Sequence, residues 1–215
     1  METTKNMQLR VGVGLLAAFL LLTVFVVAGW TQPIDDTWLS LMEDFEVSWI
    51  LSVAELFHHF GSFPIALATS VLVSIVFIIT KHWWAFWAWF AIVAGTQILS
   101  TITKILIDRP RPVEALVYES SASYPSGHAM VSGAAIGIGL AVILGIIWPS
   151  RHRLFLATGI AYAVVMAWSR TYLRVHWFTD VMAGLLFGTA IVCLVAMAAV
   201  HRRGEVGDSI RDDGE

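Results

Sequence analysis

Long stretches without a charged residue recur along this chain, and they limit its possible folds more than any other feature. Hydrophobic residues make up 58% of the 215 positions and the mean hydropathy is +0.76, so the chain is far more apolar than an ordinary soluble domain. Each stretch is close to the roughly 20 residues that a helix needs to cross a bilayer. The stretches are 11–29, 63–80, 82–103, 129–150, 154–169 and 181–200. The sequence therefore predicts an all-α integral membrane bundle of six transmembrane helices.

The stretches are spread along the chain and leave no room for a separate soluble module, so residues 1–203 are predicted to form a single membrane domain. Residues 204–215 are rich in Gly and Asp, which predicts a disordered cytoplasmic tail. The net charge of −3 argues against a nucleic-acid partner. The single cysteine, Cys193, excludes a disulfide within the chain.

The distribution of Lys and Arg predicts the orientation, because positive residues gather in cytoplasmic loops. Six crossings place most of the 13 cations on one side, which predicts a multi-pass protein of the cytoplasmic (inner) membrane with both termini in the cytoplasm. The other cations fall on the opposite side, against the topological tendency, and so predict an active site on the extracytoplasmic face. These exceptions are Lys104, Arg109, Arg111, Arg170 and Arg174.

The segment 33–60, called the outer segment below, alternates acidic and apolar residues and has no Lys or Arg. This pattern predicts one or two amphipathic helices at the outer interface of the membrane. The sequence does not distinguish a lip that admits lipid sideways from a packed connector. The pair His58-His59 is interpreted as solvated or hydrogen-bonded rather than as a metal pair, because adjacent residues do not share a helical face.

His176 and Asp180 are four residues apart, which places both on one face of a helix. A carboxylate bonded to one ring nitrogen fixes the tautomer and leaves the other nitrogen as a nucleophile. Such a histidine can attack phosphorus and form a phosphohistidine. A polar pair that holds two helices together is the alternative.

Pro125-Ser126-Gly127-His128 directly precedes an apolar stretch. Pro and Ser begin helices, Gly lets the backbone approach a ligand closely, and the free N–H groups of a helix start bind anions. His128 would then lie beside a bound phosphate as a general acid. A simple helix cap is the alternative for this motif alone.

Lys104, Arg111 and Arg170 complete the set of polar residues. Arginine binds phosphate oxygens bidentately and lysine acts as a point charge. Taken singly, each cation could also extend along the membrane surface. The predicted topology places all three at the same membrane face as the two histidines, which favours a phosphate site.

The three motifs together resemble the signatures of the type-2 phosphatidic-acid phosphatase superfamily. They are Lys104-x6-Arg111-Pro112, Pro125-Ser126-Gly127-His128 and Ser169-Arg170-x5-His176-x3-Asp180, complete and in the usual order. Within that superfamily, the size and layout are most similar to the bacterial phosphatidylglycerophosphatase B and undecaprenyl-diphosphate phosphatase groups.

This resemblance implies a hydrolase that removes a terminal phosphate from a membrane lipid phosphate or diphosphate, in phospholipid metabolism or the recycling of a cell-wall lipid carrier. It implies His176 as nucleophile, Asp180 as its orienting partner and His128 as general acid, without a metal or another cofactor. The implied phosphate binders are Lys104, Arg111, Ser126, Gly127 and Arg170. Residues near the motifs, expected to contact substrate, are Arg109, Tyr118, Tyr172 and Arg174.

Three other functions remain open at this point. A lipid phosphotransferase would use the same phosphohistidine and pass the group to a hydroxyl instead of water. His128, His176 and Asp180 could in principle ligate zinc, although the nearby cations disfavour a metal. A non-catalytic anion carrier would also place charges in an apolar chain, but no internal repeat is visible. The motifs do not identify the lipid, because phosphatidylglycerophosphate, undecaprenyl diphosphate and phosphatidic acid would all fit them. They do not identify the oligomeric state either.

Overall fold

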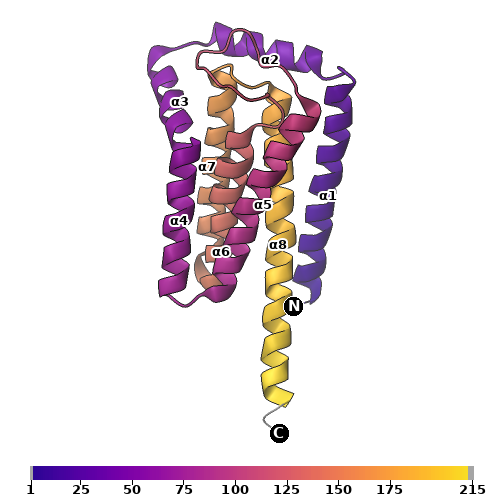
Figure 1. Cartoon of the computed structure of the whole chain (residues 1–215), viewed down its shortest axis with the longest axis vertical. Coiled ribbons are helices and arrows are strands. Elements are labelled where there is room, and N and C mark those ends of the chain that lie inside the picture. Colours follow the sequence, from indigo (N-terminus) through magenta and orange to yellow (C-terminus); the bar gives the residue numbers. More distant parts are fainter. Residues whose placement is uncertain (1, 213–215) are drawn as a thin grey trace.

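A computed structural model describes residues 2–212, and the side chains of residues 6–200. The described chain consists of helices joined by turns and loops, and contains no β-strand. The elements are α1 (Glu2–Val27), α2 (Gln32–Asp44), α3 (Ser48–Phe60), α4 (Phe63–Ile79), α5 (Trp83–Ile107), η1 (His128–Gly139), α6 (Leu140–Ile147), η2 (Pro149–Arg151), α7 (His152–Tyr172) and α8 (Phe178–Asp212). The long helices stand side by side, and α2 lies across one end of them (Figure 1). The predicted all-α membrane bundle is confirmed.

Five helical segments are long and apolar enough to cross a membrane by themselves. They lie within α1, α5, η1 with α6, η2 with α7, and α8. Helices α3 and α4 are apolar enough only as a pair, in which they are bent by 56° relative to each other, and they give a sixth span if the pair crosses as one. The chain is therefore a multi-pass membrane protein.

The outer segment contains the two helices α2 and α3, of which only α2 lies across the end of the bundle (Figure 1). Helix α3 instead runs along α7 towards α4, which differs from an interfacial position. Its buried Ala54 packs in one apolar cluster with Leu173 and Val175, and this contact draws the helix against the bundle.

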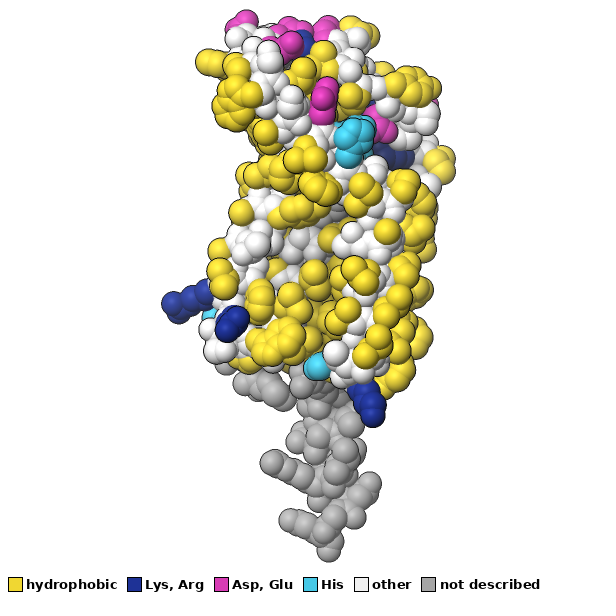
Figure 2. Space-filling model, turned by 90° about the vertical axis from the view of Figure 1, so that its left-hand side faces the viewer, with side chains coloured by type: hydrophobic (Ala, Val, Ile, Leu, Met, Phe, Trp, Pro, Cys, Tyr) yellow, Lys and Arg dark blue, Asp and Glu magenta, His cyan; other side chains and the backbone are white. Residues whose placement is uncertain are grey.

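The two ends of the bundle differ in charge. Helix α1 begins and α8 ends away from α2 (Figure 1), so the described chain starts and finishes on the side opposite α2. Figure 2 shows acidic side chains gathered near α2, a broad apolar surface along the middle, and protruding basic side chains towards the other end. Helix α8 continues to Asp212, within the tail 204–215 for which we expected disorder; residues 213–215 and all side chains after 200 lie outside the described part.

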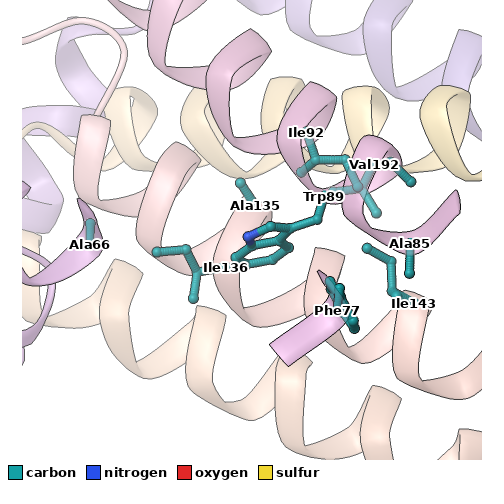
Figure 3. Packing of buried hydrophobic residues seen from close by; sticks show 10 residues of the cluster. Ala66, Phe77, Ala85, Trp89, Ile92, Ala135, Ile136, Ile143 and Val192 are labelled. Atoms are coloured by element: carbon teal, nitrogen blue, oxygen red, sulfur yellow. The ribbon is translucent and has the colours of Figure 1, made fainter. Parts of the chain in front are cut away.

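The largest apolar cluster lies in the middle of the bundle around Trp89 of α5, which is 1% exposed (Figure 3). Its ring contacts residues from α5, η1, α6 and α8, among them Ile92, Ile143 and Val192. The indole Nε1 donates to the carbonyl of Ser70 in α4 over 3.1 Å, so this polar atom is satisfied inside the apolar core. This cluster fixes the helices whose α2-side ends carry the motifs.

Candidate active site

The three sequence motifs meet at the end of the bundle that α2 covers. Lys104 lies in the last turn of α5, His128 begins η1, and Arg170 lies in the last turn of α7. The loop 108–127 supplies Arg111, and the loop after α7 supplies His176. Since these elements are far apart in sequence, the site depends on how the helices pack.

The end of α5 places the first motif. Asp108 adopts a left-handed conformation with φ of 43°, which Asp tolerates better than most residues, and its N–H bonds to the carbonyl of Lys104. Pro110 follows and prevents the helix from continuing. The chain therefore turns across the bundle directly after Lys104, and Arg111 is carried over His176.

The start of α8 places His176 beside Asp180. The Asp180 carboxylate caps the helix by accepting the N–H of Trp177 at Oδ2 over 3.0 Å. The same oxygen lies 3.4 Å from Nδ1 of His176 and accepts the hydroxyl of Ser123. Ser123 Oγ also lies 3.3 Å from Nδ1. The carboxylate thus holds one ring nitrogen and leaves Nε2 facing away from it.

A cation covers this second nitrogen. Arg111 Nη1 lies 3.2 Å from His176 Nε2, and because arginine can only donate, Nε2 is the acceptor. The tautomer with its proton on Nδ1 follows. Burial lowers the pKa of His176 well below its ordinary value of 6.5, and the charges of Arg111, Lys104 and Arg170 lower it further. The ring is therefore neutral at pH 7, as a nucleophile requires.

Backbone carbonyls of the loop 108–127 and of Val175 accept further hydrogen bonds from these cations. Arg111 donates from Nε to the carbonyl of Ser121 over 2.8 Å and from Nη1 to that of Val175 over 2.7 Å. Lys104 Nζ donates to the carbonyl of Ala122. Each of these acceptors is uncharged, and a phosphate oxygen would bind both cations more strongly.

Arg170 is fully buried and lies beside the second histidine of the site. It donates to Glu119 over 2.8 Å and to Nδ1 of His58 over 2.7 Å. The His58 ring stacks on His128 with centroids 5.5 Å apart, and His128 Nε2 lies 3.2 Å from the His58 carbonyl. The hydrogen-bonded interpretation of His58 is confirmed, and α3 becomes part of the site.

Within the described side chains, His58, Glu119 and His128 bring one donor atom each to within 4.8 Å of one another. The Arg170 guanidinium already bonds two of these three groups. A cation placed among them would be repelled by a buried positive charge. This group therefore fits an anion better than a metal.

The turn 125–128 packs on the first turns of α8. The N–H of Ser126 bonds to the carbonyl of Asp180 over 3.0 Å, and its Oγ accepts the N–H of Ala129 over 3.4 Å. Ser126 therefore lies at the start of η1, directly before the N-cap residue Gly127. A Cβ on Gly184 would lie 2.6 Å from the Ser126 carbonyl, so only glycine permits this contact. Gly127 lines the adjoining cavity together with Lys104 and His128.

Two cavities lie beside these residues. The first, of about 480 Å³, is lined by Lys104, Glu119, Gly127 and His128 together with residues of α4 and α5. The second, of about 330 Å³, lies between α4 and α5 and is almost wholly apolar. Both touch Phe63, Ala66, Gln97 and Val131. The first cavity, the chamber lined by Lys104 and His128, thus adjoins an almost wholly apolar one.

The residues expected to contact substrate have other partners. Arg109 binds Asp35 and Asp180, Arg174 binds Glu43 and Glu46, and the Tyr172 hydroxyl bonds to the backbone at Phe45 and Val47. Tyr118 lies on the loop 108–127 and is 87% exposed. The first three therefore connect the outer segment to the site, and substrate contact stays a prediction for all four.

Four residues of the site have no counterpart in the motifs: Asp35, His58, Glu119 and Ser123. Ser123 and Glu119 lie in an irregular loop, where no periodicity predicts their direction. Asp35 is one of several acids in α2 and differs from them only in its burial.

Comparison with known proteins agrees with this geometry. Residues 84–204 match the sequence profile of the PAP2 superfamily. Phosphatidylglycerophosphatase B of Bacillus subtilis is 27% identical over 187 residues, which are 85% of this chain and 92% of that protein. An undecaprenyl-diphosphatase of Sulfolobus acidocaldarius is 41% identical over 69 residues, which are 32% of this chain and 30% of that protein.

Solved structures show the same arrangement of helices. The crystal structure of the transmembrane PAP2 type phosphatidylglycerolphosphate phosphatase from Bacillus subtilis superposes with a TM-score of 0.78 at 26% identity, over 86% of this chain and 93% of that one. The crystal structure of Aquifex aeolicus LpxE gives 0.60 at 19% identity, over 74% of this chain and 92% of that one, and shares the fold.

Proposed function

Because this chain belongs to the PAP2 superfamily, we propose that it is a membrane phosphatase that removes the terminal phosphate from a lipid phosphate or diphosphate through a phosphohistidine. One observation carries the proposal: the buried, neutral His176 is held by Asp180 at Nδ1, while Nε2 faces Arg111 among three cations. A nucleophile surrounded by positive charge fits a phosphoryl group, whose oxygens carry the negative charge of the transition state.

In the first step, His176 Nε2 attacks phosphorus, and the bond from phosphorus to the lipid oxygen breaks. His128 gives its proton to the departing alkoxide, or to the lipid phosphate when the substrate is a diphosphate. Lys104, Arg111 and Arg170 bind the non-bridging oxygens, with Ser126 and Gly127 at the start of η1. Arg111 leaves Nε2 for a phosphate oxygen as substrate binds.

In the second step, His128 takes a proton from water, the water oxygen bonds to phosphorus, and the P–N bond breaks. Phosphate leaves and His176 returns to its neutral form. His128 thus acts as acid and then as base, which restores its proton at the end of the cycle. Asp180 keeps the proton on Nδ1 throughout and stabilises the positive charge that the ring gains on phosphorylation.

The apolar cavity between α4 and α5 supports a lipid substrate. Its walls would accept hydrocarbon, and it adjoins the chamber that contains Lys104 and His128. A lipid would then reach the site from within the bilayer, with its phosphate at the α2 end. We place this end on the extracytoplasmic side of the cytoplasmic membrane and both termini in the cytoplasm, because Lys81, Arg151 and Arg153 lie at the opposite end.

The test is phosphate release by the purified, detergent-solubilised protein from phosphatidylglycerophosphate, undecaprenyl diphosphate, phosphatidic acid and a water-soluble phosphate ester. We expect turnover of at least one lipid at a higher kcat/KM than the soluble ester. His176→Ala should abolish turnover and leave the melting temperature near that of the wild type, and ³²P-labelled substrate should label the wild type transiently but not this variant. Full activity of His176→Ala, or preference for the soluble ester, would contradict the proposal.

A further inference from the structure

Asp35 differs from every other acidic residue of the outer segment because it is buried. It is 1% exposed, whereas Asp36, Glu43, Asp44, Glu46 and Glu55 are exposed. Burying a charge in a membrane protein is costly unless it is paired, and such charges usually serve function. The partners of Asp35 therefore indicate what it does.

Arg109 joins Asp35 to Asp180. One terminal nitrogen, Nη2, donates to Asp35 Oδ2 over 2.7 Å, and the other, Nη1, donates to Asp180 Oδ1 over 2.7 Å. The Arg109 side chain is 9% exposed and both carboxylates are fully buried. Its guanidinium also lies over the Trp177 ring, 5.3 Å from the centroid, which restricts its rotation. One cation is thus shared between two buried carboxylates in a fixed geometry.

Asp35 also contacts the first turn of α8 directly. Its Oδ1 accepts the N–H of Thr179 over 2.9 Å, and its Oδ2 accepts the Thr179 hydroxyl over 2.7 Å. Thr179 directly precedes Asp180 in the first turn of α8, where backbone N–H groups lack partners within the helix. A residue of α2 therefore caps α8 and fixes the backbone that carries Asp180.

The two oxygens of Asp180 have separate partners. Oδ1 accepts from Arg109, while Oδ2 accepts from Ser123 and the N–H of Trp177 and faces His176. Because Arg109 holds Oδ1, it determines the rotation of the carboxylate and so the direction of Oδ2.

We propose that Asp35 is a positioning residue for the phosphatase reaction, acting through Arg109 and Thr179 to orient Asp180 against His176. This assigns a role to α2, and it rests on the proposed function of His176 and Asp180. Asp35 touches neither the phosphate chamber nor the attacking nitrogen, so its effect falls on the chemical step and not on binding.

The test compares Asp35→Asn, Arg109→Gln and the double variant, with Asp36→Asn as the matched control on the same helix. Asp36 is exposed and bonds within α2 to Gln32. We expect Asp35→Asn to lower kcat about 10- to 100-fold, as loss of the residue behind a catalytic ligand commonly does, with little change in KM. Asp36→Asn should match the wild type.

The double variant separates positioning from mere packing. Arg109→Gln alone leaves Asp35 and Asp180 as neighbouring buried carboxylates without their shared cation, so they repel each other. Adding Asp35→Asn removes this repulsion, and kcat should rise several-fold above that of Arg109→Gln. Arg109→Lys, which keeps the charge, should retain more activity than Arg109→Gln. If the kcat of the double variant falls by the product of the two single fold-reductions, the proposal is overturned. It is also overturned if Asp35→Asn has the same kcat as Asp36→Asn.

The same set of variants distinguishes failure of this inference from failure of the proposed function. A wild type that releases phosphate from none of the lipids would refute the function. The melting temperatures of the wild type, the two single variants and the double variant still form a double-mutant cycle. In that cycle, the double variant should melt at a higher temperature than Arg109→Gln. Additive melting temperatures would refute the bridge independently of activity. Should Asp35→Asn fail to fold, Arg109→Lys against Arg109→Gln gives the decisive comparison of kcat.

Discussion

Arg111 donates to His176 across 3.2 Å, so a cation lies against the nitrogen that we expect to attack phosphorus. This contact has two consequences. It lowers the basicity of the imidazole, which keeps the ring neutral, and it places a phosphate-binding group beside the reacting atom before substrate arrives.

The pH dependence of turnover should report this contact. The neutral ring is the active form, and its pKa in the wild type lies well below 6.5 because of burial and the charges of Arg111, Lys104 and Arg170. Removing a neighbouring positive charge favours the protonated ring and so raises this pKa. Arg111→Gln should therefore move the acid limb of the kcat/KM profile upwards, towards pH 6.5, in addition to weakening substrate binding. Arg153→Gln at the opposite end is the control, and an acid limb that stays in place in Arg111→Gln would contradict this account.

Ser123 should contribute to catalysis although it lies outside the motifs. Its hydroxyl contacts both Asp180 and His176, so its loss removes one support of the pair while the direct contact remains. Ser123→Ala should lower kcat by about tenfold, the size of one lost hydrogen bond of about 1.4 kcal/mol. Asp180→Asn should lower it by about 10⁴-fold, as in other carboxylate–histidine pairs that lose the correct tautomer. The exposed Ser120 gives the control Ser120→Ala, and a loss in Ser120→Ala equal to that in Ser123→Ala would exclude a specific role.

Gly184 should be intolerant of a methyl group. A Cβ there would lie 2.6 Å from the Ser126 carbonyl and 3.2 Å from the N–H nitrogen of Met130, both backbone atoms that cannot rotate away. Gly184→Ala should therefore lower stability by about 1–3 kcal/mol and reduce kcat by displacing His128. Gly95→Ala is the matched change in a membrane-spanning helix, because a Cβ at Gly95 meets nothing within 4 Å. Thermal unfolding in detergent measures both, and equal melting temperatures for the two variants would contradict the argument.

Turnover should survive a strong metal chelator. The ligands that could gather a metal near the site, His58, Glu119 and His128, surround the buried guanidinium of Arg170, so a cation would be repelled. Incubation with EDTA followed by removal of the chelator should leave the rate of phosphate release unchanged. A rate that falls and is restored by added zinc would indicate a metal-dependent mechanism instead.

The apolar stretches were sufficient to predict the bundle, because a helix that crosses a bilayer needs a length of hydrocarbon that few other structures require. The bend between α3 and α4 was not predicted. Helix α3 carries acidic and histidine residues at the positions where a span would be apolar, and only its packing on α7 shows that it joins α4. A pattern of hydropathy cannot detect such a tertiary contact.

The motif residues were brought to one end of the bundle as the sequence predicts, because their positions relative to the helix ends are encoded locally. The immediate partners of these motif residues were not predicted. Ser123 comes from a loop without periodicity, and the burial of Asp35 depends on α2 lying across α8. Arg109 also binds Asp180, and its position between Lys104 and Arg111 in the sequence carries no sign of this partner.

Helices α2 and α3 precede residue 84, where the match to the superfamily begins, yet α2 supplies Asp35 and α3 supplies His58. A fragment cut to the residues that match the superfamily profile would therefore lose both side chains, and with them the groups that hold Arg109 and Arg170 in place.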